Sequence, residues 1–483
     1  MNLDNDLISI QEVRDKVHLA AVAQKSLEQL SQAEIDSIVR NMSEEAAKAA
    51  EMLARLAVEE TGFGNVQDKV TKNLFAAQRV HDAIKDMKTV GIIQVDEGKK
   101  VWEIAEPVGV IAGIIPSTNP TSTIIFKALI AIKARNAIVF SPHPAALNCS
   151  LQAVKIMNDA AIAAGAPEGA VQGIEHSSLD ASRELMSHIK TNLILATGGP
   201  GMVKAAYSSG KPAYGVGPGN VPVYVHKSAN ITRSARQIIE SKAFDYGTIC
   251  ASEQAVVVDE EIKDRFLTEL QKKGAYFLNP AEKEKVAGIL LKNNSLNTQI
   301  VGRSPLEIAE LAGIGIPEGT KILVGEEEDI GKNAPFSLEK LSTVLAFYTV
   351  KDWQEGCEIS MKLLEVGGLG HTIGIHANED EVILAFALKK PASRVIVNSG
   401  TTFGGIGATT GIFPSMTLGC GTYGNNITTD NIGPQHLLNI KRVAFGIREM
   451  DNNSQQIELE SSEGEISVEE ITKIVMQVIS QLT

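Results

Sequence analysis

Short, almost uninterrupted apolar runs recur along this chain and constrain its fold more than any other feature. The first four are VGVIAGIIP (108–116), NAIVFSP (136–142), NLILATGG (192–199) and VPVYV (221–225). Such runs suit strands that are buried on both faces, as in a parallel sheet. Helical patterns separate them at 121–134, 145–164, 179–189 and 200–207. The alternation predicts a doubly wound α/β domain.

A second alternating block follows the first. Its apolar runs are AVVVD (255–259), KILVG (321–325), STVLAFY (342–348), HTIGIH (371–376) and RVIVN (394–398), with a helix predicted from 261. We therefore expect two α/β domains, 1–225 and 226–418. Residues 9–60 and 65–88 are predicted to be helical, and 91–105 is predicted to form a β-hairpin around a polar turn at 96–100. Residues 419–449 are expected to be a return segment.

Composition excludes several classes of protein. The chain has 483 residues, 44% of them hydrophobic, which is enough for two sizeable cores. Its net charge of −13 argues against a nucleic-acid-binding protein, which needs a basic surface. No stretch approaches 18 uncharged apolar residues, so we expect no membrane span. The first ten residues carry no Lys or Arg, so they do not resemble a secretory signal.

The four cysteines stand at 149, 250, 357 and 420. This wide spacing predicts neither a disulfide framework nor a zinc site, and no metal site is expected. A reducing cytoplasm is the natural compartment for such a chain.

The C-terminal segment differs in composition from the rest. Residues 450–465 are polar and acidic, which is typical of a solvated linker. Residues 466–483, ISVEEITKIVMQVISQLT, place seven apolar residues on one helical face, and Ser467 with Glu470 forms a capping box. Such a helix could pack on its own protein or on a sister subunit. Alternatively, it could be a docking peptide for another protein.

Four side chains are candidates for chemistry, and each has a simpler structural interpretation. Cys250, in DYGTICASEQ, could be a nucleophile or an inert core residue. His371 could act as a base or be a satisfied structural histidine. Glu339 could accept a ribose hydroxyl or pair with a surface lysine. Asn119 could donate its amide to a ligand or cap the helix that follows Pro120.

Two glycine-rich turns are candidates for phosphate binding. The segment LATGGPGMVKAA (195–206) leaves a strand and opens a helix, which brings backbone N–H groups towards a phosphate. The segment GVGPGN (215–220) lies between two α/β segments. Each could equally be a tight turn between a strand and the next element.

In combination these segments are much more specific. The stretch 106–144, the turns 196–220, ICASEQ, EKLS and GGLGHT follow one another in an order that resembles the coenzyme A-acylating aldehyde dehydrogenases. The likeness is strongest to the aldehyde dehydrogenase half of the bifunctional aldehyde–alcohol dehydrogenases, and it runs from about residue 10 to about 445. It implies an aldehyde dehydrogenase-like fold with a Rossmann-like cofactor domain and a catalytic domain. Because the chain stops at 483, a free-standing acylating enzyme is expected.

The resemblance also implies roles for individual residues. Cys250 matches the family's nucleophile, Asn119 its oxyanion donor, and His371 a histidine near the nucleophile. The positions that match the dinucleotide-binding residues are Ile114, Ile115, Pro116, Ser117, Thr118, Asn119, Gly199, Gly217, Glu339 and Leu418. The hairpin near 91–105 and the segment near 430–445 match oligomerisation strands, so a homo-oligomer is expected.

One departure from the hydrolytic aldehyde dehydrogenases predicts the type of reaction. Those enzymes carry, in an ELGGK segment, a Glu that activates water, whereas Val216 occupies that position here. Slow hydrolysis would let a thiol compete for the acyl group. We therefore expect NAD-dependent oxidation of a short aldehyde to its acyl-coenzyme A thioester through a thioacyl group on Cys250. His371 would act as base for the incoming thiol or for Cys250.

Acetaldehyde is the expected substrate, with propionaldehyde and sulfoacetaldehyde as alternatives. Other hypotheses are a hydrolytic or phosphorylating dehydrogenase, and a catalytically silent, shell-associated protein. The tail resembles the peptides that target enzymes into bacterial microcompartments, so residues 466–483 are expected to bind a shell protein. The expected location is the cytoplasm, within a microcompartment lumen.

Overall fold

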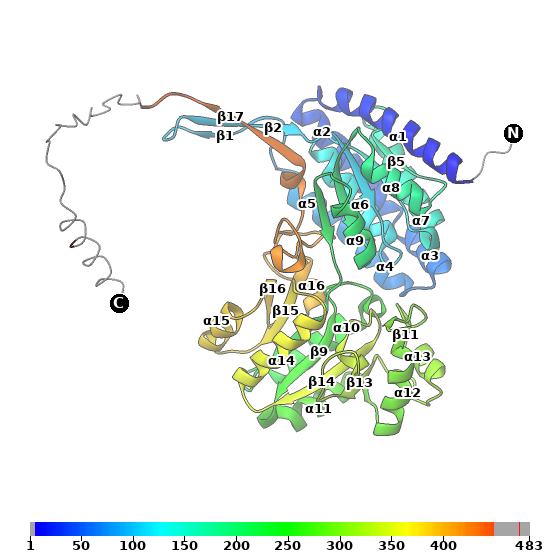
Figure 1. Cartoon of the computed structure of the whole chain (residues 1–483), viewed down its shortest axis with the longest axis vertical. Helices are drawn as coiled ribbons and strands as arrows, with labels where there is room; N and C mark the ends of the chain where they lie inside the picture. The colour runs from blue at the N-terminus through cyan, green and yellow to red at the C-terminus, as the bar shows by residue number, and fades with distance from the viewer. Residues whose placement is uncertain (1–4, 449–472, 474–483) are drawn as a thin grey trace.

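The computed structural model describes residues 5–448 and Lys473, and Figure 1 shows two lobes with an arm that projects from the upper one. The predicted linker 450–465 and the predicted helix 466–483 fall outside the described residues, apart from Lys473. No helix within 5–448 combines the length and the apolar character that crossing a membrane requires.

The upper lobe contains a five-stranded parallel sheet with the order β5-β4-β3-β6-β7. Its strands are β3 (Val110–Ile114), β4 (Ala137–Ser141), β5 (Val171–Gly173), β6 (Thr191–Thr197) and β7 (Ala213–Val216). The connecting helices are α6 (Pro120–Lys133), α7 (Leu147–Ala163), α8 (Leu179–Ser187) and α9 (Pro200–Tyr207). The predicted doubly wound domain is confirmed. The strand order reverses between β3 and β6, which are adjacent in this sheet.

The centre of this lobe is fully buried. Every residue of β3, β4 and α6 is buried, which explains why their sequences read as continuous apolar runs. Polar residues of α6 are buried as well, and among them Lys127 donates from its side-chain nitrogen to the carbonyl oxygens of Ile114 (2.7 Å) and Leu195 (2.8 Å). It therefore bridges the carboxyl ends of β3 and β6.

The N-terminal helices cover this sheet (Figure 1). They are α1 (Asn5–Leu27), α2 (Gln32–Lys48), α3 (Ala50–Thr61), α4 (Val66–Leu74), the π-turn η1 (Phe75–Arg79) and α5 (Val80–Ile84). The prediction of helix across 9–60 is right in type but misses two breaks. The first break is explained by a capping box, in which Ser31 accepts from the N–H of Glu34 and Glu34 accepts from the N–H of Ser31.

The lower lobe contains a seven-stranded parallel sheet with the order β10-β13-β14-β9-β8-β15-β16. Its strands are β8 (Val221–Val225), β9 (Glu253–Asp259), β10 (Ala275–Phe277), β13 (Ile322–Glu326), β14 (Val344–Val350), β15 (Gly370–His376) and β16 (Ala392–Val397). The helices are α10 (Ile231–Ala243), α11 (Lys263–Lys272), α12 (Pro280–Leu290), α13 (Pro305–Ala312), α14 (Trp353–Val366), α15 (Asp380–Leu388) and α16 (Thr401–Gly405). A small ladder of β11 (Leu291–Lys292) and β12 (Ser295–Leu296) lies beside α12.

One predicted strand lies in the other sheet. The run at 221–225 was grouped with the first domain, but β8 pairs with β9 and β15. The change from one sheet to the other therefore falls between Val216 and Val221 rather than after residue 225. Apolar content reports burial on both faces, which is the same in either sheet, so it does not identify a strand's partners.

The projecting arm is a three-stranded antiparallel sheet. The predicted hairpin is confirmed as β1 (Gly91–Asp96) and β2 (Val101–Pro107), and β17 (Leu438–Ala444) returns to pair with β2. Figure 1 shows β17, in orange, joining the two blue strands away from both lobes. Segments more than 300 residues apart in the chain thus share one sheet.

Candidate active site

The loop that carries Cys250 connects α10 to β9. It begins with the 3₁₀ turn η3 (Phe244–Gly247), in which Asp245 (φ 45°) and Tyr246 (φ 51°) adopt left-handed backbone conformations. Cys250 is partly exposed, whereas its neighbours Ile249 and Ala251 are buried. The loop therefore presents a single thiol from an otherwise buried segment, as the nucleophile hypothesis requires.

The amino ends of three neighbouring strands lie near Cys250. The strands β9, β8 and β15 are neighbours in the lower sheet, and they begin just after Cys250, just after Gly219 and just before His371, respectively. A Cβ atom built on Gly219 would lie 2.2 Å from the carbonyl oxygen of Cys250 and 3.2 Å from Cδ2 of His371. Gly219 thus brings these two residues together at the amino edge of the sheet, and a larger residue would separate them.

The His371 imidazole is neutral at pH 7 and only weakly basic. Its side chain is fully buried, and burial lowers its pKa to about 3, with Arg394 contributing in the same direction. Nδ1 lies 3.0 Å from Oγ1 of Thr372, and Nε2 has no hydrogen-bond partner among the described residues. A neutral imidazole with one uncommitted nitrogen can accept a proton.

Glu339 also contacts Gly219. Its Oε1 accepts a hydrogen bond of 3.0 Å from the backbone N–H of Gly219, so the predicted alternative of a surface ion pair is not what the structure shows. Burial raises the pKa of this carboxyl group to about 7, and the Gly219 N–H partly offsets that rise. Glu339 is therefore close to half-ionised at neutral pH and retains acceptor capacity for a hydroxyl.

Asn119 occupies the N-cap position of α6, but its side chain makes no capping hydrogen bond within the described part of the chain. The amide Nδ2 instead donates to the carbonyl oxygen of Thr248, at 3.3 Å, and to Oγ1 of Thr118, at 3.1 Å. Thr248 stands two residues before Cys250. The amide nitrogen thus faces the Cys250 loop.

Eight of the ten residues predicted to bind the dinucleotide lie at one edge of the upper sheet, whereas Glu339 and Leu418 come from other segments. The loop Ile114–Asn119 follows β3, Gly199 follows β6, and Gly217 follows β7, and these parallel strands are adjacent. Their loops therefore meet at the carboxyl edge, where the strand order reverses between β3 and β6. Open α/β sheets bind ligands at that position.

Local geometry at this edge fits a phosphate-containing ligand. Gly199 is exposed, caps the N-terminus of α9, and has nothing within 4 Å of the position of a Cβ atom. The first N–H groups of a helix attract phosphate, and an open, side-chain-free approach leaves room for it. The first residues of the other predicted segment, Ile114 and Ile115, are buried, whereas Pro116, Ser117 and Thr118 are partly exposed.

Leu418 is linked to the site through Arg394. The Arg394 guanidinium is buried and donates to the carbonyl oxygens of His371 (2.9 Å) and Gly419 (2.6 Å), and to Oγ1 of Thr372 (3.2 Å). It thereby holds Gly419, which follows Leu418, against the start of β15. Arg394 was not predicted from the sequence, because a single arginine within an apolar strand has no distinctive pattern.

A buried ionic cluster behind the Cys250 loop was also missed. Lys69 and Lys72 of α4 both contact the carboxylate of Asp245, and all three side chains are at most 2% exposed. The i, i+3 spacing places the two lysines on one helical face, but lysines at such a spacing usually face water. Only the fold reveals that this face is covered.

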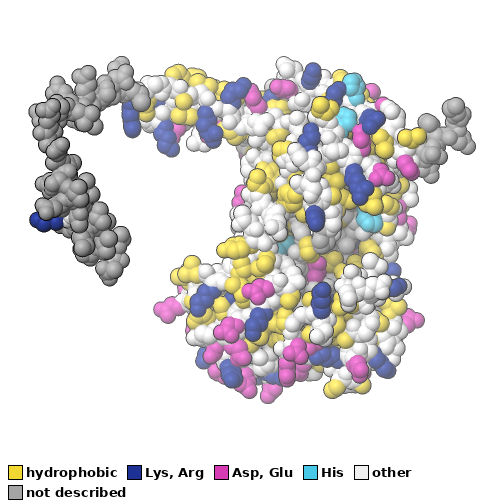
Figure 2. Space-filling view, in the orientation of Figure 1, with side chains coloured by type: hydrophobic (Ala, Val, Ile, Leu, Met, Phe, Trp, Pro, Cys, Tyr) yellow, Lys and Arg dark blue, Asp and Glu magenta, His cyan; other side chains and the backbone are white. Residues whose placement is uncertain are grey.

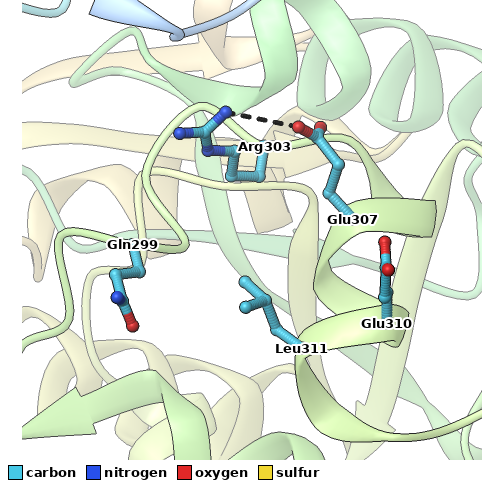
Figure 3. A pocket seen from close by; sticks show the side chains of 5 residues that line it. All are labelled: Gln299, Arg303, Glu307, Glu310 and Leu311. Atoms are coloured by element: carbon cyan, nitrogen blue, oxygen red, sulfur yellow. Dashed lines mark hydrogen bonds and ion pairs between the residues drawn. The ribbon is translucent and has the colours of Figure 1, made fainter.

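A surface hollow of about 440 Å³ lies elsewhere on the lower lobe. It is lined by Gln299, Arg303, Glu307, Glu310 and Leu311 (Figure 3). Arg303 points towards Glu307 and pairs with it at 3.3 Å. The hollow includes none of the residues that converge on Gly219.

Comparison with known proteins identifies the family. Residues 6–336 match the Aldehyde dehydrogenase family. The chain belongs to this family. Its sequence is 45% identical over 441 residues to the bifunctional aldehyde-alcohol dehydrogenase of Escherichia coli K12, covering 90% of this chain and 50% of that protein. The chain thus spans about half the length of the curated relatives that it matches most significantly.

Other members of the aldehyde dehydrogenase family match along their whole length. The crystal structure of an acetylating aldehyde dehydrogenase from Geobacillus thermoglucosidasius is 63% identical, with a TM-score of 0.92, covering 93% of this chain and 99% of that one. The succinate-semialdehyde dehydrogenase (acetylating) of Clostridium kluyveri is 40% identical, covering 91% of this chain and 96% of that protein. The predicted fold and the predicted relationship to acylating aldehyde dehydrogenases are confirmed.

Proposed function

We propose that this chain is an NAD-dependent acetaldehyde dehydrogenase that transfers the acyl group to coenzyme A. The observation that carries the proposal is the meeting of Cys250 and His371 at Gly219, with the Asn119 amide turned towards the Cys250 loop. A thiol, a neutral base and an amide donor are the groups that acyl transfer through a thioester needs.

Each residue has one role in this mechanism. His371 Nε2 accepts the thiol proton, and the Cys250 thiolate attacks the aldehyde carbonyl. The Asn119 amide and the backbone N–H of Cys250 stabilise the oxyanion, and each such donor contributes about 3 kcal/mol. The loops at the carboxyl edge of the upper sheet would hold a nicotinamide cofactor, which would supply the hydride acceptor there. The acyl group then remains on Cys250 as a thioester until the coenzyme A thiol takes it.

The dinucleotide-binding assignment rests on the carboxyl edge described above. The loop Ile114–Asn119 and Gly199 would surround the phosphates, and Glu339 would accept a ribose hydroxyl. Relatives show the same ligand classes: a Rhodopseudomonas palustris propionaldehyde dehydrogenase, 28% identical, was solved with bound CoA and an acylated cysteine. An engineered glycolyl-CoA reductase, also 28% identical, was solved with NADP+.

One assay separates this function from its alternatives. NADH formation is followed with acetaldehyde and NAD, with and without coenzyme A, and the products are identified by mass spectrometry. An acylating enzyme yields acetyl-coenzyme A and needs coenzyme A for turnover. A hydrolytic enzyme forms NADH and acetate without coenzyme A, and a catalytically silent protein forms no NADH.

The nucleophile and the substrate are tested in the same assay. Cys250→Ala should abolish turnover and leave thermal unfolding unchanged, because the thiol lies on a loop. Even a few per cent of residual activity would place the nucleophile elsewhere. Comparing kcat/KM for acetaldehyde, propionaldehyde and sulfoacetaldehyde, and for NAD and NADP, then identifies the preferred substrates. A preference for either other aldehyde would refute the acetaldehyde assignment.

We also propose that residues 466–483 direct the enzyme into a protein shell in the cytoplasm. In the sequence, residues 466–483 would form a helix with one apolar face after the polar linker 450–465, and such a face needs a partner. A propionaldehyde dehydrogenase from the Clostridium phytofermentans fucose utilisation bacterial microcompartment, 29% identical with a TM-score of 0.81, supports the setting. A fluorescent protein fused to 450–483 should enter a co-expressed shell, and deleting 450–483 should leave specific activity unchanged. A diffuse reporter would refute shell targeting.

A further inference from the structure

The buried ionic cluster behind the Cys250 loop has no part in the mechanism above. Lys69 Nζ lies 3.0 Å from the Asp245 carboxylate, and Lys72 Nζ contacts the same oxygen. Burial favours neutral acid at Asp245, but the ammonium groups of Lys72 and Lys69 keep its pKa below the usual value. Burial lowers the pKa of Lys72 to about 8, partly offset by Asp245. Asp245 and Lys72 therefore remain charged at neutral pH.

Lys72 differs from Lys69 because it also reaches the oxyanion donor. Its Nζ donates to Oδ1 of Asn119, at 2.5 Å. An ammonium group has donors only, so the oxygen of the Asn119 amide must be the atom that faces it. The amide nitrogen is then turned to the other side, where it donates to the Thr248 carbonyl of the Cys250 loop.

We propose that Lys72 is a positioning residue, which holds the Asn119 amide with its N–H groups towards Cys250. This inference rests on the proposed function, in which Asn119 stabilises the oxyanion. The terminal torsion of an asparagine is soft, and an amide without a fixed partner can present either end. An inverted amide would place its oxygen against the developing negative charge. A hydrogen bond from an ammonium to Oδ1 also strengthens the donors on Nδ2.

Lys69 provides a matched comparison within the same cluster. It lies one turn earlier on α4, is equally buried and contacts the same carboxylate oxygen. Its remaining contact is with the backbone carbonyl of Thr118, at 3.2 Å, rather than with the Asn119 side chain. Loss of either lysine removes one charge from the cluster, but only the loss of Lys72 removes the hydrogen bond to Oδ1 of Asn119, together with a longer one to Oγ1 of Thr248 at 3.3 Å.

The test is a double-mutant cycle measured in the acetyl-coenzyme A assay. Lys72→Met and Lys69→Met are each made in the parent enzyme and in the Asn119→Ala enzyme. Removing one oxyanion donor lowers kcat by about 100- to 1000-fold. Because an unheld amide still points correctly part of the time, we expect Lys72→Met to lower kcat by about 10- to 100-fold. KM for acetaldehyde should stay within about threefold.

The two backgrounds distinguish positioning from general support of the loop. In the Asn119→Ala enzyme, Lys72→Met should change kcat by less than about twofold, since the amide is already absent. Lys69→Met should cause a smaller loss that is equal in both backgrounds. Alkylation of Cys250 by iodoacetamide forms no oxyanion, so Lys72→Met should leave its rate unchanged.

Several outcomes would overturn the inference. An equal loss from Lys72→Met in both backgrounds, or a fall in the alkylation rate to match kcat, would show that Lys72 supports the loop itself. Full activity of Lys72→Met in a parent that forms acetyl-coenzyme A would also refute it, whereas a parent that forms none would refute the proposed function. If Lys72→Met fails to fold, the same cycle is run with Lys72→Leu and Lys69→Leu, in each of which the remaining lysine still pairs with Asp245.

Discussion

The surroundings of Cys250 oppose the ionisation that its chemistry requires. Burial raises the pKa of the thiol to about 12, with Cys420 and Glu339 acting in the same direction and Arg394 against them. At neutral pH the free enzyme therefore holds a protonated thiol. The proposed mechanism assigns the thiol proton to His371, which is neutral and whose Nε2 has no hydrogen-bond partner among the described residues.

This pKa predicts how the free enzyme reacts with alkylating agents. For a thiol with a pKa near 12, the thiolate fraction increases about tenfold for each unit by which the pH is raised, as long as the pH stays below the pKa. The rate of iodoacetamide modification at Cys250, followed by peptide mass spectrometry, should therefore increase about tenfold from pH 7 to 8 and again from 8 to 9. A rate that levels off near pH 7 would show a thiolate stabilised by a cation, contrary to this interpretation.

Val216 is the residue at which the hydrolytic pathway can be tested. It is buried, ends β7 and stands three residues before Gly219. A carboxylate there should activate water, so Val216→Glu is expected to release acetate when coenzyme A is withheld. Val216→Gln has the same size without the carboxylate and serves as the control. If acetate release is equal in the two variants, Val216 does not occupy the position of a water-activating residue.

At the scale of secondary structure, the site depends on where strands begin and end. Cys250, Gly219 and His371 stand at the amino ends of three adjacent strands, whereas the predicted dinucleotide loops stand at carboxyl ends. The residues on the lower sheet therefore move together if any one strand shifts. At Gly219 there is no room for a side chain, because its backbone lies against the Cys250 carbonyl.

Gly219→Ala should therefore damage catalysis through backbone displacement. A Cβ atom 2.2 Å from the Cys250 carbonyl oxygen cannot be accommodated without moving the loop. We expect kcat to fall at least 100-fold, because small misplacements of reacting groups carry large losses. Gly288→Ala, in α12, has nothing within 4 Å of the new methyl group and controls for the substitution itself. Near-normal kcat in Gly219→Ala would mean that the nucleophile's loop tolerates the shift.

The elements show which parts of this arrangement a sequence can predict. Apolar runs predicted the buried strands, because burial on both faces leaves a local pattern, whereas the ligand-binding roles of the glycine turns and of Cys250 stay predictions. The breaks within 9–60 were missed, although Ser31 and Glu34 give the first one a local pattern. Pairing partners leave no such pattern, so β8 was assigned to the wrong sheet. Lys72 and Arg394 were missed for a related reason. Their roles depend on which segments cover them, and that is a property of the whole fold.

At the scale of the molecule, the arm projects from the upper lobe, and other described segments of the chain leave its apolar side chains exposed. Figure 2 shows hydrophobic side chains along it, together with lysines and arginines. Ile92, Val95 and Phe445 are each 47–48% exposed, and the outer edge of β1 has no partner strand among the described residues. An open, partly apolar edge is a template for pairing with another chain. This supports the predicted role of the arm in a homo-oligomer.

Charging the open edge should separate the subunits without inactivating them. Ile92→Asp with Val95→Asp places two like charges on β1, where a second copy would pack. Light scattering should show a fall in molar mass to that of a single chain, while activity per chain is kept, because all the candidate catalytic residues come from one chain. Leu306→Asp with Leu388→Asp charges two exposed leucines on the lower lobe and should leave the mass unchanged. If the β1 variant keeps the parent's mass, the arm is not the interface, and if it becomes monomeric but inactive, the site needs a neighbouring subunit.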